Sequence, residues 1–359
     1  MRPRSVRTLL SVLLLSTAAA CESAMAPTPL DPAGVQSDLS AASAAVSAPA
    51  TASLGALGPQ IGLALADAGG ALGMAELPAA LLKDPDALAA RSDLRARVLD
   101  GGNTASVIPQ AALGKTFEYD TTVDRYAAGQ RSGAPVNGVR FVLYAVDPLS
   151  DELVFPLVET GYVDLSRTVT NQSLTARVEA FSGGQTPVKV LDYAATVQGT
   201  ITNPTVIVAG FARNGVDSLT FTLSSTVSLA NSTIAIDWRT ALPSRGLSSR
   251  VQQTLTGGEL PQVTIDGLLQ SQSGRVGITG TLLAQSGGTL TVKVNGDTFA
   301  TIALDGLVDD TPTILNAQGQ PPTPAEAAML RQILEWFENA FDTYEDLLDP
   351  VDQLLDLTF

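Results

Sequence analysis

The most informative absence in this 359-residue chain is histidine, which does not occur at all. Without it the chain cannot form Ser-His-Asp or Cys-His catalytic groups, a histidine-ligated zinc site, or the usual general base near neutral pH. The chain has only one cysteine, which excludes an intrachain disulfide and a thiolate metal cluster. Acid–base chemistry would therefore depend on carboxylates, and we expect no metal and no cofactor.

Basic residues are also scarce, since 21 Lys and Arg stand against 36 Asp and Glu, giving a formal charge of −15. A nucleic-acid partner needs a basic face to neutralise phosphates, so we expect none. A polybasic contact with an anionic membrane surface is equally poorly supported. Aromatic residues make up 5% of the chain and hydrophobic residues 45%, which is enough for one large or two modest cores.

The N-terminus has the pattern of an export signal. Three arginines lie at positions 2, 4 and 7, and an apolar stretch that ends in small residues follows up to position 20, which predicts a secretory signal peptide over 1–20. The segment 16–21, STAAAC, resembles the lipobox of bacterial lipoproteins, although Ala18 stands where leucine is commonest. The resemblance implies that Cys21 carries acyl chains and becomes the mature N-terminus. The alternative is ordinary cleavage after Ala20, which leaves Cys21 as a free thiol.

Because Glu22 rather than aspartate follows the cysteine, the resemblance further implies an exported protein anchored in the outer membrane, facing the periplasm or the outside. Residues 21–52 are mostly Ala, Ser, Pro and Thr, so we expect a flexible tether there. Residues 53–110 predict a short helical segment, in which Asp84-Pro85 is a natural N-cap and first-turn pair.

From residue 111 to 310 the pattern changes to alternation with a period of two. The clearest strand is Val216–Leu229, whose apolar side chains Leu219, Phe221, Leu223 and Val227 alternate with serine and threonine. Asn214-Gly215 and Asn295-Gly296 are tight-hairpin signals between such runs. About twelve strands with short connections predict a large curved antiparallel meander, half-barrel or sandwich-like, with one dry and one solvated face.

Residues 311–359 predict a linker followed by an acidic amphipathic helix. Thr323 to Glu326 form a capping box with proline at the first helical position. The apolar stripe comprises Leu330, Ile333, Leu334, Phe337, Phe341 and Tyr344, among other residues. Two interpretations stand: the stripe packs on the dry face of the sheet as core, or the helix is a lid over a hydrophobic cavity or a docking element for a partner.

The remaining candidates for catalysis or metal binding are carboxylates. Acidic residues cluster in two segments, at Asp147, Asp151 and Glu152 and at Asp305, Asp309 and Asp310, and neither cluster matches a calcium-binding loop. A curved sheet around a helix resembles, in architecture, the half-barrel carriers of lipids or lipoproteins in bacterial envelopes, although no motif of that group occurs.

The sequence therefore favours a non-catalytic envelope lipoprotein that binds a lipid or other hydrophobic ligand, or has a structural or interaction role. It does not identify a protein partner. The alternative is a carboxylate-dependent glycoside hydrolase acting on envelope polysaccharide, which would need two carboxylates at a set spacing across a cleft.

Overall fold

The computed structural model describes residues 30–67, 108–147, 150, 152–170, 173–200, 202–257, 261–283, 286–304 and 312–337. These residues divide into two compact units. Unit 1 contains Ser43–Thr220, and unit 2 contains the residues up to Ala42 together with those from Phe221 onward.

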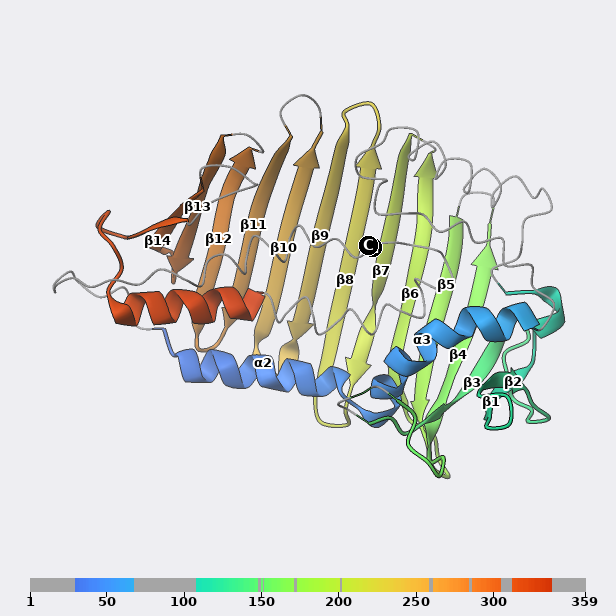
Figure 1. The fold of residues 1–359 in the computed structure, drawn as a ribbon. Coiled ribbons are helices and arrows are strands. Elements are labelled where there is room, and N and C mark those ends of the chain that lie inside the picture. The colour runs from blue at the N-terminus through green and yellow to red at the C-terminus, as the bar shows by residue number, and fades with distance from the viewer. Residues whose placement is uncertain are drawn as a thin grey trace. The chain divides into compact units, whose positions relative to one another are not determined.

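The fold is mainly β, as expected, with the strands ordered in one open, mixed sheet. Strands β3 to β15 follow one another in the sheet as they do in the chain, and β1 and β2 lie beyond β3 (Figure 1). In unit 1 the strands are β1 (Thr116–Asp120), β2 (Arg125–Ala128), β3 (Gly138–Tyr144), β4 (Glu159–Val169), β5 (Ser173–Ser182), β6 (Lys189–Thr200) and β7 (Asn203–Arg213). β8 (Ser218–Ser228) begins in unit 1 and continues in unit 2. Unit 2 contains β9 (Thr233–Leu242), β10 (Leu247–Thr256), β11 (Gln262–Ser271), β12 (Gly274–Leu283), β13 (Gly287–Val294), β14 (Asp297–Leu304) and β15 (Thr313–Asn316).

Short turns produce the antiparallel pairing, as the sequence predicts. At Asn295-Gly296 both residues have positive φ, of 51° and 98°, and two residues connect β13 to β14. The Asn295 side chain also accepts a hydrogen bond from the N–H of Arg275 at 2.8 Å. The exception is β1, which pairs with β3 in parallel, because β2 turns back along the outer side of β1.

The core of unit 1 lies between the sheet and helix α3 (Pro49–Asp67), which crosses β2 to β6 (Figure 1). The helix buries side chains at three- and four-residue spacing, which forms the apolar stripe expected of a core-facing helix: Leu54, Leu57, Ile61, Ala64 and Leu65. The opposing strands contribute alternate residues such as Phe141, Val163, Val178 and Tyr193. This packing explains why α3 continues through Gly58 and Pro59, since tertiary burial rather than propensity stabilises most helices.

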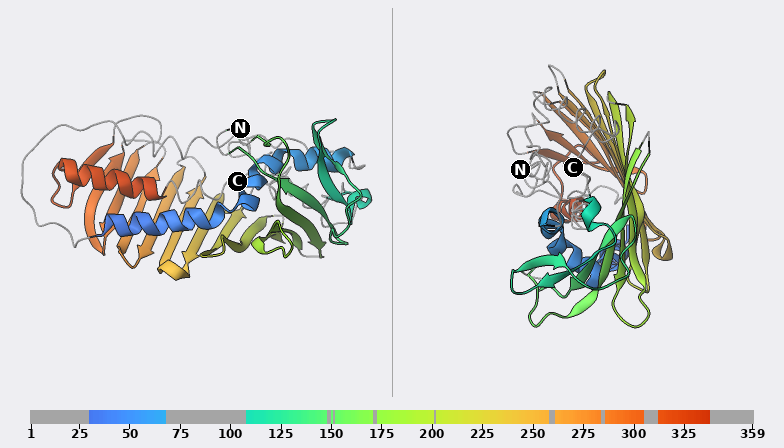
Figure 2. Two further views of the ribbon diagram at one scale, coloured as in Figure 1. Left: turned by 90° about the horizontal axis from the view of Figure 1, so that it is seen from below. Right: turned by 90° about the vertical axis from the view of Figure 1, so that its right-hand side faces the viewer.

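Unit 2 is covered by two helices that lie side by side on its strands (Figure 2). One is the first part of α2 (Pro32–Val46), and the other is the C-terminal helix 324–337. Trp336, only 1% exposed, donates a hydrogen bond from Nε1 to Gln36 Oε1 at 2.8 Å and so joins the two helices. Phe337 packs on β11, where a Cβ placed on Gly267 would lie 3.1 Å from its ring. The absence of a side chain at Gly267 therefore lets this helix approach the sheet.

The capping box at the start of the C-terminal helix is confirmed. The N–H of Thr323 donates to Glu326 Oε2 at 2.7 Å, and the N–H of Glu326 donates to Thr323 Oγ1 at 3.3 Å. The predicted core role of the helix agrees with its burial, since Leu330, Ile333 and Phe337 are 3%, 0% and 8% exposed.

The expectation of a flexible tether over 21–52 is wrong from Pro32 onward, where the structure has helix α2 and then the start of α3. Asp31 caps α2, because its Oδ1 accepts from the N–H of Gly34 at 3.1 Å and its own N–H donates to Ser273 O at 3.1 Å. A Cβ on Gly34 would overlap Ser273, so small residues here allow close helix–sheet contact rather than flexibility.

Two further boundaries differ from expectation. The helical segment expected over 53–110 begins earlier, because α3 starts at Pro49, and β15 lies within the expected linker after 310. The signal peptide 1–20, Cys21, the helix around Asp84-Pro85 and the end of the C-terminal helix with Phe341 and Tyr344 fall outside the described residues.

Candidate functional site

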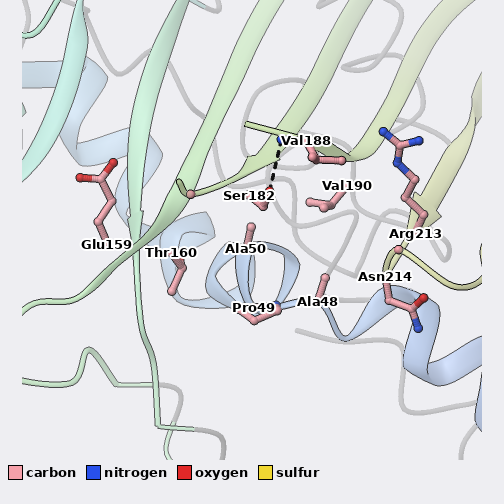
Figure 3. Close-up of a pocket in the computed structure, with 12 residues that line it drawn as sticks. Ala48, Pro49, Ala50, Glu159, Thr160, Ser182, Val188, Val190, Arg213 and Asn214 are labelled. Atoms are coloured by element: carbon pink, nitrogen blue, oxygen red, sulfur yellow. Dashed lines mark hydrogen bonds between the residues drawn. The ribbon is translucent and has the colours of Figure 1, made fainter. Parts of the chain in front are cut away.

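A pocket of ≈ 430 Å³ lies within unit 1, between the start of α3 and the ends of four strands (Figure 3). This volume is within the range of about 300–1,000 Å³ typical of small-molecule sites. One wall is the start of α3 with the preceding Ala48, and the other comes from β4, β6, the ends of β5 and β7 and the loops that follow those two strands. The lining residues are Ala48, Pro49, Ala50, Glu159, Thr160, Ser182, Gly183, Val188, Val190, Arg213, Asn214 and Gly215.

The antiparallel order explains why these residues meet. In a meander, alternate connections lie at the same end of the sheet. The connections β3–β4, β5–β6 and β7–β8 therefore share one end, and the parallel pairing of β1 with β3 brings the β1–β2 turn there too. Serine and asparagine side chains shape these connections: Ser182 Oγ accepts from the N–H of Val188 at 3.2 Å, and Asn214 Oδ1 accepts from the N–H of Asp217 at 2.9 Å.

The same end of unit 1 carries exposed apolar side chains, which we name the apolar rim. Phe155 and Val158 in the β3–β4 connection are 58% and 55% exposed, Val188 beside the pocket is 48% exposed, and Val216 is 85% exposed. The rim also includes Val123 in the β1–β2 turn and Val154. These side chains belong to connections at the same end of unit 1, and of them Val188 also lines the pocket. Exposed apolar surface is a feature of interaction and ligand sites.

The start of α3 is held in place beside the pocket by Ser53, which is 3% exposed. Its hydroxyl donates to Tyr144 O at 2.8 Å and lies 3.1 Å from Thr160 Oγ1. One buried side chain thereby ties the helix to β3 and β4. The helical wall of the pocket is consequently fixed to the strands that form the opposite wall.

Charged side chains occupy opposite margins of the pocket, with the small apolar side chains between them (Figure 3). Glu159 accepts a hydrogen bond at 2.9 Å from Arg131, which also pairs with Glu118 at 3.1 Å, and these contacts raise the pKa of Arg131. At the other margin, Arg213 donates from Nε to Lys189 O and lies over the Phe211 ring at 5.7 Å. Within the described part of the chain, no carboxylate pairs with Arg213.

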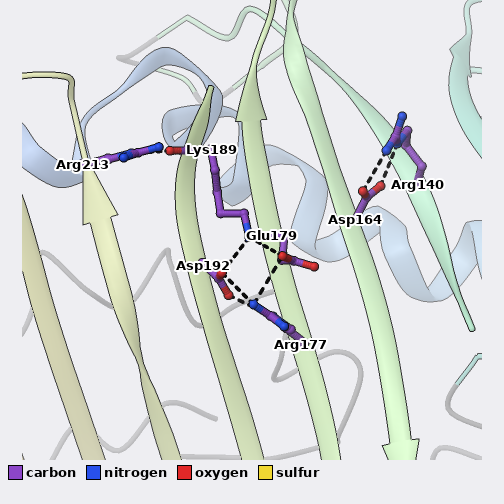
Figure 4. A network of polar contacts seen from close by, with 7 residues as sticks. All are labelled: Arg140, Asp164, Arg177, Glu179, Lys189, Asp192 and Arg213. Atoms are coloured by element: carbon purple, nitrogen blue, oxygen red, sulfur yellow. Dashed lines mark hydrogen bonds and ion pairs between the residues drawn. The ribbon is translucent and has the colours of Figure 1, made fainter. Parts of the chain in front are cut away.

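The outer face of unit 1 carries a charged network across β3 to β6 (Figure 4). Arg140 forms a bidentate pair with Asp164 at 2.7 and 2.8 Å, and Lys189 bridges Glu179 at 2.5 Å and Asp192 at 2.8 Å. The strand register explains why cations are needed here. It makes Asp164, Glu179 and Asp192 direct cross-strand neighbours, and these carboxylates would repel one another without the cations between them.

Burial and hydrogen bonding act on these carboxylates in opposite directions. Burial raises the pKa of Asp164, and this effect outweighs the lowering caused by the hydrogen bond from Arg140. The same hydrogen bond raises the pKa of Arg140. Burial also opposes ionisation at Asp192, but hydrogen bonds from Arg177 and Lys189 outweigh it and lower the pKa of Asp192. The carboxylates of this network therefore all form ion pairs within the protein, and we assign the network a structural role.

None of the described residues that the sequence singles out for a hydrophobic cavity or core lines this pocket. Leu219, Phe221 and Leu223 of β8 are buried, whereas Val227 is partly exposed. On the C-terminal helix, Leu330, Ile333 and Phe337 are buried and Leu334 is partly exposed. The pocket residues escaped the sequence analysis because none has unusual chemistry. The Asn214-Gly215 signal predicted the turn after β7, but no local pattern shows which loops share one end of the sheet.

The acidic clusters give no catalytic geometry in the described ranges. Asp147 and Glu152 are exposed in the β3–β4 connection, where the N–H of Asp147 donates to Glu152 O at 2.8 Å. Asp151, Asp305, Asp309 and Asp310 lie outside the described residues. Among the residues that the structure describes, no three Cys, Asp or Glu side chains are grouped to hold a metal ion.

None of the helices in the described ranges is long and apolar enough to span a membrane. Comparisons of the chain with protein-family models, curated proteins and solved structures find no match.

Proposed function

We propose that the protein is a non-catalytic envelope lipoprotein that binds a hydrophobic ligand in the pocket at the end of unit 1. The observation that carries this proposal is the position of the pocket at the same end of unit 1 as the apolar rim. Ala48, Ala50 and Val190 give the pocket an apolar interior, and Val188 belongs to both the pocket and the rim. A hydrophobic ligand that enters there would gain about 25 cal/mol for each Å² of apolar surface removed from water.

The location of the protein is part of the same proposal. Export by the segment 1–20 and acylation of Cys21 would anchor the protein in the outer membrane, close to a source of acyl lipids. In cells that produce the full chain, Cys21→Ala should move the protein from the membrane fraction to the soluble fraction. Unchanged membrane retention would contradict the lipid anchor without bearing on the pocket.

A neutral hydrophobic dye tests the pocket directly. Nile red should become fluorescent on titration with the wild-type protein, and Val188→Asp should weaken its binding about tenfold or more, because a charge at the pocket mouth would have to be desolvated. Val169→Asp is a matched control: Val169 is 47% exposed against 48% for Val188, but it lies at the opposite end of β4. Equal losses in both variants, or no binding by the wild type, would rule out the pocket as a hydrophobic site.

The glycoside hydrolase alternative gains no support from this site. Of the residues that line the pocket, Glu159 is the one carboxylate, and it is paired with Arg131. A glycosidase needs a second carboxylate about 5–9.5 Å across the cleft.

A further inference from the structure

The margin of the pocket formed by Arg213 points to the chemical class of the ligand. We propose that the ligand is an amphiphile with a carboxylate head, of the medium-chain fatty-acid type, and that Arg213 binds the carboxylate. The inference rests on the proposed function, because it concerns the same pocket.

The contacts of Arg213 leave its terminal nitrogens available. Nε is occupied by Lys189 O, which fixes the side chain at the end of β7 and beside β6. The two Nη groups have no carboxylate partner in the described part of the chain. A guanidinium whose Nε is already bonded still presents its two Nη groups as paired donors, which match the two oxygens of one carboxylate.

The surroundings distinguish Arg213 from the other cations near this end of unit 1. Lys189 is held by Glu179 and Asp192 on the outer face, and Arg131 is held by Glu118 and Glu159. These cations are already neutralised by protein carboxylates, whereas among the described residues no carboxylate pairs with Arg213. Because Glu159 lies on the opposite side of the pocket and is paired, it does not compete for Arg213 (Figure 3).

The size and lining of the pocket suit an alkyl tail. Its volume of ≈ 430 Å³ is in the range of small-molecule sites, and Ala48, Ala50 and Val190 line the space between the two charged margins. Dodecanoate, with a single unbranched tail, is therefore a suitable probe. The head group would then remain at the partly exposed margin, where Arg213 lies beside Val188 (Figure 3).

The test compares two ligands that differ only in the head group, dodecanoate and dodecanol, by calorimetric titration of the full chain at about pH 8, where the carboxylate is ionised. The wild type should bind dodecanoate about tenfold more tightly than dodecanol, the effect of one charge-assisted hydrogen-bonded pair. Arg213→Gln should abolish this preference and leave dodecanol binding unchanged. Arg245→Gln, at an exposed arginine of unit 2, is the control and should retain the preference.

The outcomes separate the two proposals. Equal binding of both ligands by the wild type, or a preference that survives in Arg213→Gln, would overturn the carboxylate assignment and leave the hydrophobic pocket intact. If the wild type binds neither dodecanoate, dodecanol nor Nile red, the pocket itself fails as a ligand site. Circular dichroism of Arg213→Gln checks that the variant is folded, and retained dodecanol binding is a second check.

Discussion

The two units are built from similar strands but differ in what their surfaces carry. In unit 1 a cross-strand row on the outer face reads Arg140, Asp164, Glu179 and Asp192, with further cations between the acids. A cross-strand row in unit 2 reads Asp237, Gln252, Asp266, Thr279, Thr291 and Thr301, and its ion pairs are those of Asp237 with Arg239 and Arg250. All of the strongly exposed large hydrophobic side chains in the described ranges also belong to unit 1: Val123, Val136, Val154, Phe155, Val158, Val169, Val188 and Val216.

This difference shows that one type of sheet can be specialised by its loops and its outer face. In unit 2 four of the six side chains in this row are uncharged, and two helices bury the apolar face. Unit 1 combines a single covering helix with an ion-paired outer face and an apolar end. Interaction therefore belongs to unit 1 in our proposals, and helix packing is the main feature of unit 2.

The largest effect should come from Trp336, since unit 2 depends on its helices. Trp336→Ala should lower the free energy of unfolding by about 3–5 kcal/mol, because it leaves a cavity between the two helices and removes the bond to Gln36. Denaturant titration would measure the loss, and fluorescence of Trp238, also in unit 2, would report the same transition. Gln36→Ala is a smaller change at the same contact, so a loss in Trp336→Ala no greater than that in Gln36→Ala would contradict a packing role.

The second largest effect should come from ion pairs, whose contribution to stability should differ between the two units. The side chains of Arg140 and Asp164 are only 18% and 13% exposed, so Arg140→Met should cost about 2–3 kcal/mol by leaving a largely buried carboxylate unpaired. Arg239→Met removes a similar bidentate pair with Asp237 in unit 2, but Arg239 is 59% exposed. Its loss should be much smaller, since solvent already screens that pair. Equal losses by denaturant titration would mean that burial does not decide the strength of these pairs.

Much of the fold could be predicted from periodicity, and the errors have identifiable causes. Alternation in β8 and the Asn295-Gly296 turn follow from local chemistry, and both are present. The tether prediction is wrong because an Ala- and Ser-rich segment can still form a capped helix: Asp31-Pro32 is the same type of capping signal as Asp84-Pro85. Gly34 is favoured because α2 approaches Ser273 closely at this position. That contact depends on the tertiary structure and cannot be predicted from the local sequence.

The pocket was harder to predict than the fold, for a topological reason. Val188, Arg213 and Ala50 are unremarkable in sequence, and they meet only because alternate connections share one end of the sheet. The Asn214-Gly215 signal predicted the turn after β7, but the positions of the pocket loops around α3 depend on where that helix begins. A pocket assembled from ordinary residues at loop ends carries no motif.

The smallest expected effect is a pH dependence that compares the outer faces. Hydrogen bonds lower the folded-state pKa of Asp192 below its unfolded value of about 3.9, so its stabilising contribution is present above that value and is lost as pH falls through the folded pKa. Asp192→Asn should therefore be less stable than the wild type at neutral pH, and the difference in free energy of unfolding should shrink below about pH 4. Asp237 in unit 2 has its pKa lowered chiefly by the hydrogen bond from Arg239, but its side chain is 25% exposed against 15% for Asp192. Asp237→Asn should show the same sign with a smaller change, and a larger change there would reverse the contrast between the two outer faces.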